Sequence, residues 1–405
     1  MKREMPRQRE PQKEKATGRR PVRIETAAEL ANLAEALLRE KVIAVDTEAD
    51  SFYHYFDKVC LVQIATRRKI FLIDPLALGG PAELAPLGPV MASSEVRKVF
   101  HAAEYDLFVL KRDCGFTFAN LFDTMVSAQL LGYPALGLGA LIERHFGVTL
   151  PKDQQRSDWS QRPLSASQES YAAADVAFLI RLAEKLEKEL REAGRLEWAD
   201  EEFRTLTERA WPERPFDELG YLRIKGARNL DDAGLGVLRE LYLVRDARAR
   251  QVDRPPFKVL GNRTLLEIAE ARPTTAEELA SIRGVSELVR RRMGREILRA
   301  VARGSRKGHG PVPRPAGNGK RRMDRRTERR LTALKRWRAA RARELALDAG
   351  VFCPNACLEA IAWKNPRRPQ DLKEVPELKG WFAREFGDEV VEVLARTRRG
   401  ERETS

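Results

Sequence analysis

KVIAVDTEAD, which spans residues 41–50 of this 405-residue chain, indicates the architecture of its first half. The continuous apolar run from Val42 to Val45 is typical of a central strand that is buried on both faces of a sheet. Asp46 and Glu48 follow two residues apart, so their side chains project from the same face of that strand. Two carboxylates at the exit of an apolar strand are costly to desolvate, and a cation between them offsets that cost.

The residues on either side of this strand predict an α/β domain with a mixed sheet. TAAELANLAEALLRE, residues 26–40, has the pattern of an amphipathic helix leading into the strand. Two β-rich segments follow, VCLVQIAT at 59–66 and KIFLID at 69–74, and their closeness predicts an antiparallel hairpin. A further strand at 96–102 precedes a helix that begins near Glu104 and that Cys114 and Gly115 would end.

A single long helix is expected between Ser165 and Gly194. Ser165 and Gln168 form a capping box at its start, and an apolar row of leucines follows: Leu179, Leu182, Leu186 and Leu190. Its first turns contain Tyr171 and Asp175, whose side chains share a face because they are four residues apart.

The net charge of +14 is concentrated in two segments. Residues 1–20 hold eight Lys/Arg against three acidic residues, and residues 303–330 hold eleven against two. Such segments suit contact with phosphates without reading a base sequence. The four cysteines are too few for a disulfide framework, and Cys353 and Cys357 lack a second ligand pair for zinc. The first 20 residues contain no apolar stretch, which predicts a cytoplasmic protein without a membrane segment.

The C-terminal half contains an internal repeat at an offset of 93 residues. Arg245, Asn262 and Ile268, for example, correspond to Arg338, Asn355 and Ile361. Two copies of a small all-α module are the simplest explanation. We expect the following divisions of the chain: a basic tail (1–20), the α/β domain (21–205), a connector (206–228), a first helical domain (229–303), a basic Gly/Pro linker (304–323) and a second helical domain (324–400).

Three segments, VDTEAD, HAAEYDLFVL and YAAADV, resemble the exonuclease motifs of the DEDD family, and their order is similar to that of the bacterial ribonuclease D family. FDTMVSAQLLGY and KDQQRSDWSQRPLS extend the resemblance over residues 40–190. The resemblance implies a ribonuclease H-like fold for the α/β domain. The repeated modules resemble two helicase-and-RNase-D C-terminal (HRDC) domains.

The resemblance also implies roles for five residues. Asp46, Glu48, Asp106 and Asp175 would ligate metal, and Tyr171 would orient the attacking water. Family members of the histidine subtype place His five residues before the last Asp, where this chain has Ser170. Oxygen ligands without Cys or His favour Mg²⁺ or Mn²⁺. Four negative charges exceed what one divalent ion neutralises, so two ions are expected.

Other polar residues near these motifs have weaker signals. His101 is expected to make a structural hydrogen bond at a strand end, and Asp123 to anchor the start of a helix. Four residues of the segment after the second motif could contact the RNA end or serve only the loop: Gln155, Ser157, Asp158 and Trp159.

These observations predict a cytoplasmic, monomeric 3′-5′ exoribonuclease that releases nucleoside 5′-monophosphates by two-metal hydrolysis. The resemblance implies transfer-RNA precursors as substrates, and the basic linker with Arg338, Arg341 and Arg343 suits a grip on RNA. Two alternatives stay open: a 3′-5′ DNA exonuclease, and a nucleic-acid-binding protein that has lost catalysis. Helicase activity is excluded because no GxxxxGK[ST] phosphate loop occurs in the chain, and no nucleotide cofactor is expected.

Overall fold

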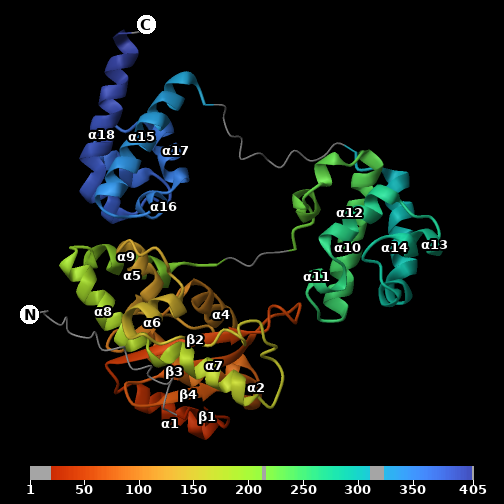
Figure 1. The fold of residues 1–405 in the computed structure, drawn as a ribbon, viewed down its shortest axis with the longest axis horizontal. Coiled ribbons are helices and arrows are strands. Elements are labelled where there is room, and N and C mark those ends of the chain that lie inside the picture. Colours follow the sequence, from red (N-terminus) through yellow and green to blue (C-terminus); the bar gives the residue numbers. More distant parts are fainter. Residues whose placement is uncertain (1–19, 212–215, 311–322, 404–405) are drawn as a thin grey trace, which may run out of the picture. The chain divides into compact units, whose positions relative to one another are not determined.

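The computed structural model describes residues 20–211, 216–310 and 323–403. It contains a six-stranded sheet with its surrounding helices, followed by helical domains (Figure 1). The expected tail lies almost entirely outside the described residues, as does most of the expected linker. Helix α14 continues to Lys307, four residues into the stretch predicted to be linker.

The sheet is mixed, as predicted. Its strands lie in the order β1-β4-β3-β2-β5-β6. β3 and β4 form the expected antiparallel pair, whereas the pairs β1 with β4, β2 with β5, and β5 with β6 are parallel. Every residue of β3 is buried, and so are Ile43, Ala44 and Val45 of β2. The strand bounds are Val22–Ile24, Val42–Ala49, Val59–Ala65, Ile70–Ile73, Arg97–Phe100 and Leu121–Asp123 for β1 to β6.

The helices of the α/β domain confirm two of the predicted boundaries. α1 (Ala27–Leu37) starts with a capping box made by Thr26 and Glu29, and α4 (Glu104–Cys114) ends at Gly115 in the left-handed conformation with φ 68°. The remaining helices up to the last pair are α2 (Pro75–Leu78), η1 (Pro81–Leu87), α3 (Gly88–Ala92), α5 (Thr124–Leu130) and α6 (Leu138–Phe146).

The prediction of one helix from Ser165 to Gly194 was wrong, because two helices occupy this range. α7 (Ala166–Ala177) starts with the expected capping box, and α8 (Leu179–Glu192) carries the leucine row. Phe178 separates them with φ −107° and ψ −9°, and its ring packs against Phe146. Apolar spacing could not reveal this break, since Phe178 is as buried as the leucines that follow it.

The internal repeat is confirmed element by element. The first helical copy consists of α10 (Asp232–Gln251), α11 (Pro256–Val259), α12 (Asn262–Ala271), α13 (Ala276–Ser281) and α14 (Glu287–Lys307). The second helical copy consists of α15 (Arg325–Glu344), α16 (Ala349–Phe352), α17 (Asn355–Lys364), η4 (Pro369–Glu374) and α18 (Gly380–Glu403). Each element of the second copy begins 93 residues after its counterpart.

Two arginines that the sequence assigned to an RNA grip make contacts that stabilise the second helical copy. Arg338 donates to the backbone oxygen of Cys353 at 2.7 Å, just as its counterpart Arg245 donates to that of Leu260 at 3.1 Å. Arg341 pairs with Glu389 at 2.8 Å and with Glu344. Both guanidiniums are thus engaged within the second helical copy, and a contact of Arg338 or Arg341 with RNA stays a prediction.

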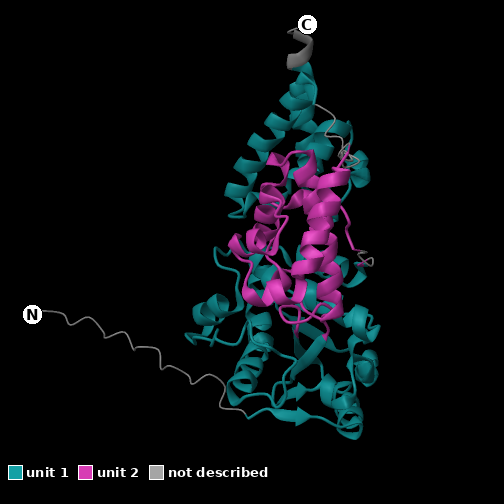
Figure 2. Ribbon diagram, turned by 90° about the vertical axis from the view of Figure 1, so that its right-hand side faces the viewer, with its two compact units in different colours: residues 1–48, 59–210, 320–405 teal, residues 49–58, 211–319 magenta. Residues whose placement is uncertain are grey.

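The chain divides into two compact units (Figure 2). Unit 1 comprises residues 1–48, 59–210 and 320–405, and unit 2 comprises residues 49–58 and 211–319. Within unit 1, α18 packs against α9 (Leu196–Glu208), and the rings of Trp198 and Trp381 stack 4.2 Å apart. Within unit 2, the short helices η2 (Gly220–Arg223) and η3 (Ala227–Asn229) precede the first helical copy.

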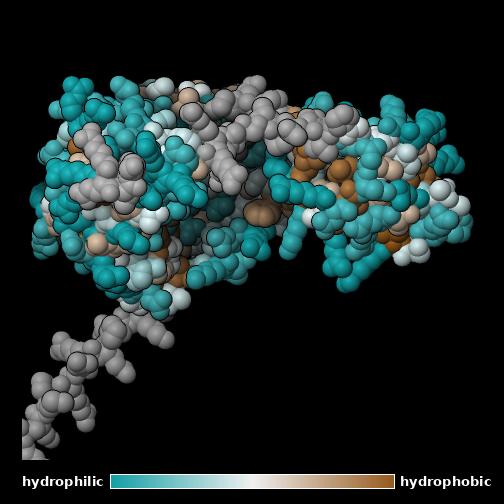
Figure 3. Space-filling view, turned by 90° about the horizontal axis from the view of Figure 1, so that it is seen from above, coloured by the Kyte–Doolittle hydropathy of each residue, from teal (hydrophilic) through white to brown (hydrophobic). Residues whose placement is uncertain are grey.

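Hydrophilic side chains dominate the coloured surface in the space-filling view (Figure 3). Over the described ranges, none of the helices has the length and apolar character needed to cross a membrane.

Candidate active site

Three carboxylates from two elements meet near the end of the internal strand β2. Asp46 and Glu48 lie near the end of β2, and Asp175 lies in the last turn of α7. One ligand atom from each of the three lies within 4.8 Å of the others. α7 packs against β3 and β4, which fixes its place on the sheet. The structure therefore brings together residues that are separated by about a third of the chain.

Asp106 lies beside this group on the first turn of α4. Its buried carboxylate accepts a hydrogen bond of 2.5 Å from the hydroxyl of Thr47, the residue between Asp46 and Glu48. Its charge raises the pKa of both neighbouring acids. Asp106 is nevertheless not one of the three residues whose oxygens lie within 4.8 Å of one another.

Asp123 holds the start of the helix that carries Asp106. Its carboxylate accepts from the backbone N–H groups of Ala102 at 3.1 Å and Ala103 at 2.7 Å. It also caps α5 by accepting from Met125 and Val126, which confirms the predicted anchoring role. Ala102 has a φ of 61°, a conformation that residues other than glycine rarely adopt. The two bonds to Asp123 hold this turn in place.

His101 makes the structural hydrogen bond predicted for it. Its Nδ1 lies 2.9 Å from the hydroxyl of Thr124, which itself donates to the backbone oxygen of Phe100. The Thr124 oxygen therefore accepts from His101. Burial lowers the pKa of His101 to about 4, so the ring is neutral at physiological pH.

Tyr171 lies one turn before Asp175 on α7 and donates a hydrogen bond to its carboxylate. The phenol ring is 8% exposed and packs against Trp159, with 6.0 Å between ring centroids. Burial and the charges of Asp175 and Glu48 raise the pKa of Tyr171 above its usual value. The hydroxyl is therefore protonated and can act as a hydrogen-bond donor.

The four acids are costly to ionise together. Burial, followed by repulsion from the other three, raises the pKa of Asp46 well above its usual value. Burial and the charges of Asp175 and Asp106 raise the pKa of Glu48 to about 9. Burial likewise raises the pKa values of Asp106 and Asp175 to about 7. A bound cation would offset both causes, so the donor set fits a hard divalent ion with oxygen ligands.

These pKa values predict that the metal-free protein becomes less stable as pH rises. A carboxyl whose pKa is higher in the folded state binds extra protons there, so its stabilising contribution is lost as pH rises towards the folded value. The loss should extend from about pH 4 through 7 for Asp106 and Asp175, and to about 9 for Glu48. We expect Asp106→Asn to be the more stable protein in EDTA at pH 8 by a few kcal/mol, since a tenfold change in proton affinity corresponds to about 1.4 kcal/mol.

Chemical denaturation of both proteins at pH 5 and pH 8 measures this difference. Saturating Mg²⁺ should reverse it, because the variant lacks one of the carboxylates. A variant that loses stability relative to the parent between pH 5 and pH 8 in EDTA would contradict the proposed charge repulsion.

A cavity of about 500 Å³ opens over the carboxylates. Asp46, Glu48, Tyr171 and Asp175 form part of its lining. The other lining residues come mainly from the start of α6 and the segment after it: Gly137, Leu138, Gly139, Ala140, Leu150, Pro151, Lys152 and Gln155. Lys152 is a cation in this lining that was not predicted as a site residue, although it is the first residue of the KDQQRSDWSQRPLS segment.

Of the four weaker candidates, only Gln155 lines the cavity. Ser157 accepts from Gln168 at 3.0 Å, and Asp158 accepts from the backbone and hydroxyl of Ser160. Trp159 is 1% exposed behind Tyr171. These three residues shape the turn that leads into α7.

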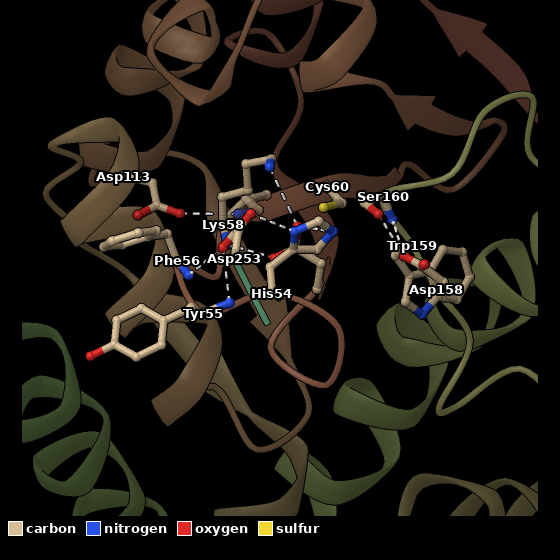
Figure 4. Close-up of polar contacts among 12 residues, drawn as sticks. His54, Tyr55, Phe56, Lys58, Cys60, Asp113, Asp158, Trp159, Ser160 and Asp253 are labelled. Carbon is tan, nitrogen blue, oxygen red and sulfur yellow. Dashed lines mark hydrogen bonds and ion pairs between the residues drawn. The ribbon is translucent and has the colours of Figure 1, made fainter. Parts of the chain in front are cut away.

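The loop after β2 has a partner that lies about 200 residues away in the sequence (Figure 4). Residues 49–58 belong to unit 2, where Asp253 accepts from the backbone N–H groups of Tyr55 at 3.0 Å and Phe56 at 3.1 Å. The second oxygen of Asp253 lies 2.7 Å from Nδ1 of His54. Asp253 has a φ of 45°, at the turn after α10. No local sequence pattern links Asp253 to the loop, so its role could not be predicted from the sequence.

Comparisons with known proteins identify the relatives of this chain. Residues 21–191 match the family described as 3′-5′ exonuclease, and residues 234–301 and 327–394 each match the HRDC domain. Ribonuclease D of Gluconacetobacter diazotrophicus is 35% identical, with 92% of each chain covered. Ribonuclease D of Sphingobium indicum is 31% identical over 90% of this chain and 92% of its own length.

A solved structure agrees with these sequence relatives. Escherichia coli RNase D, described as an exoribonuclease involved in structured RNA processing, matches with a TM-score of 0.67 and 27% identity. The match covers 93% of this chain and 99% of that one.

Proposed function

Because the chain belongs to the ribonuclease D family of 3′-5′ exoribonucleases, we propose that it trims the 3′ ends of transfer-RNA precursors and releases nucleoside 5′-monophosphates. The observation that carries this proposal is that three carboxylates and Tyr171 line one cavity, while Asp106 is hydrogen-bonded to Thr47 between two of them. We also propose that the enzyme acts as a monomer.

We propose that this site holds two Mg²⁺ or Mn²⁺ ions. Asp46, Glu48 and Asp175 would hold one ion, and Asp106 would provide a further carboxylate for a second. When bound, such ions lower the pKa of water and stabilise the attacking and leaving oxygens of phosphodiester hydrolysis. The raised pKa values of the acids support this assignment, because four buried carboxylates without cations would hold protons near neutral pH.

The surrounding residues would bind the RNA end and orient the water. Tyr171 keeps its proton, so its hydroxyl can orient the attacking water by hydrogen bonding. Lys152 and Gln155 line the cavity and are suited to contact the terminal nucleotides. His101 is neutral and engaged with Thr124, which suits a wall of the site better than proton transfer.

Digestion of a transfer-RNA precursor with a 3′ extension tests this proposal. The precursor is labelled at the 5′ end in one sample and at the 3′ end in another, with matched RNA and DNA oligonucleotides alongside. We expect a ladder of single-nucleotide steps and labelled 5′-monophosphate, both dependent on Mg²⁺ or Mn²⁺. Degradation of DNA alone would identify a DNA exonuclease, and no release with either metal would indicate a binding protein. An intact precursor beside a degraded oligonucleotide would refute the transfer-RNA role.

A further inference from the structure

The last helix of the first helical copy, α14, carries a row of arginines on one face. Arg292, Arg295, Arg299, Arg303 and Arg306 follow one another at spacings of three or four residues, which places them on one side of the helix. Arg303 pairs with Glu240 at 2.8 Å. The other four are exposed and form no ion pair with any acidic side chain in the described part of the chain. We call these four residues the α14 face.

A hollow of about 430 Å³ borders this face within unit 2. It lies between α10 and α14, and Arg299 and Arg303 line it together with Arg248 of α10. Glu296 is the one carboxylate among its described lining residues. The hollow therefore has a strongly positive wall.

Three of the four positions of the α14 face have acidic counterparts in the second helical copy, whereas Arg306 corresponds to Arg399. At the positions 93 residues after Arg292, Arg295 and Arg299, α18 carries Glu385, Asp388 and Glu392. The repeat thus provides an internal comparison, in which three equivalent positions are cationic in one copy and anionic in the other.

α18 uses this region to dock on α9 of the α/β domain. Trp381 stacks on Trp198, whose indole N–H donates to Glu385. Arg384 donates to Glu201 at 2.8 Å, and the indole N–H of Trp381 donates to Glu202 at 2.8 Å. In the second copy, the last helix is therefore a protein-docking surface with an aromatic centre.

The α14 face lacks that aromatic centre. Leu288 occupies the position of Trp381 and is 54% exposed, and Met293 occupies that of Phe386. Protein interfaces are enriched in buried aromatic residues, whereas phosphate-binding surfaces are rich in arginine. The α14 face is rich in arginine and has no aromatic centre, which favours a polyanion over a protein as its partner.

We propose that the α14 face binds the phosphate backbone of the RNA substrate. Four guanidiniums between residues 292 and 306 span about 21 Å along the helix at a rise of 1.5 Å per residue. Each guanidinium can donate two parallel hydrogen bonds to a phosphate. The choice of RNA among polyanions rests on the proposed function, whereas the assignment of the surface rests on the arginines and the repeat.

The test measures RNA binding by the full chain in EDTA, so that no cleavage occurs. A fluorescent RNA hairpin with a 3′ single-stranded extension is titrated between 50 and 200 mM KCl, and log K is plotted against log salt. For R292Q/R295Q/R299Q/R306Q we expect the slope to become shallower by about 3, since each lost single-strand phosphate contact removes about 0.7. Affinity at 0.1 M salt should fall by roughly 10²-fold.

A matched variant removes the same charge from the α/β domain. R39Q/R68Q/K69Q/K188Q replaces four exposed cations that do not line the cavity, and its slope should stay within about 1 of the parent. The corresponding Arg→Lys variant of the α14 face keeps the positive charges and should recover most of the affinity. Circular dichroism checks that each variant is folded.

Cleavage of a single-stranded tetranucleotide in Mg²⁺ separates the two proposals. The α14 variant should retain its rate within about twofold, because the short substrate engages the cavity alone. An unchanged salt slope, or an equal loss in the matched variant, would overturn the α14 assignment. An acidic protein as the true partner would also leave RNA affinity intact. If the parent enzyme releases no nucleotide, the proposed function is refuted. The binding measurement in EDTA would still test the α14 face, because it does not depend on cleavage.

Discussion

Turnover should fall by at least about 10³-fold when Asp46 is replaced by alanine, with RNA binding largely retained. The carboxylate of Asp46 lies next to those of Glu48, Asp175 and Asp106, so its loss removes a central ligand of the proposed metal site. Divalent ions supply several kcal/mol of transition-state stabilisation, and each 1.4 kcal/mol corresponds to a factor of ten in rate. Single-turnover degradation of labelled RNA measures the rate, and anisotropy in EDTA measures binding.

Asp175→Ala should show the same loss, because Asp175 provides the third ligand of the cluster from a different element. Glu35→Ala serves as the control, since this carboxylate is 74% exposed on α1 and should leave the rate unchanged. A near-normal rate for either site variant would refute the assignment of the four carboxylates.

Tyr171→Phe should lower the single-turnover rate by roughly 10² to 10³-fold, the effect typical of removing one well-placed hydrogen-bond donor from an active site. The substitution retains the ring that packs on Trp159, so the fold of α7 should be preserved. Substrate affinity should change little, because the hydroxyl acts on the water rather than on the RNA. The rate is measured at saturating RNA and Mg²⁺.

Tyr133→Phe is the matched control for this prediction. Tyr133 also donates its hydroxyl to a carboxylate, that of Glu189, but it is not among the residues that line the cavity. Its loss should leave the rate within about twofold of the parent. Equal rates for the two phenylalanine variants would show that the Tyr171 hydroxyl has no part in the reaction.

The sequence was most informative where a buried apolar segment directly precedes the proposed catalytic residues. The apolar run before Asp46 predicted the central strand, and the hairpin and the mixed sheet follow from short-range patterns. β1 and β6 were missed because each has only three residues, too few for a periodic signal. Their places depend on parallel pairing with β4 and β5, which is a tertiary property.

Charged side chains were harder to assign than apolar ones. Arg338 and Arg341 looked available for RNA, yet a backbone oxygen and Glu389 engage them. The four arginines of the α14 face are the same residue type but form no ion pair in the described structure. Sequence gives the type of a charged residue, whereas its availability depends on partners that the fold brings to it. Ser157, Asp158 and Trp159 illustrate the same limit beside the cavity.

The bonds from Asp253 to the segment after β2 bear on how this enzyme could be shortened. A fragment that stops after α9 would keep every proposed metal ligand and Tyr171. It would also remove Asp253, the acceptor for the backbone N–H groups of Tyr55 and Phe56. Tyr55 is only seven residues after Glu48 in the sequence. A minimal nuclease cut from this gene would therefore differ from the parent enzyme only a few residues from two of its proposed metal ligands, even with no residue of the α/β domain removed.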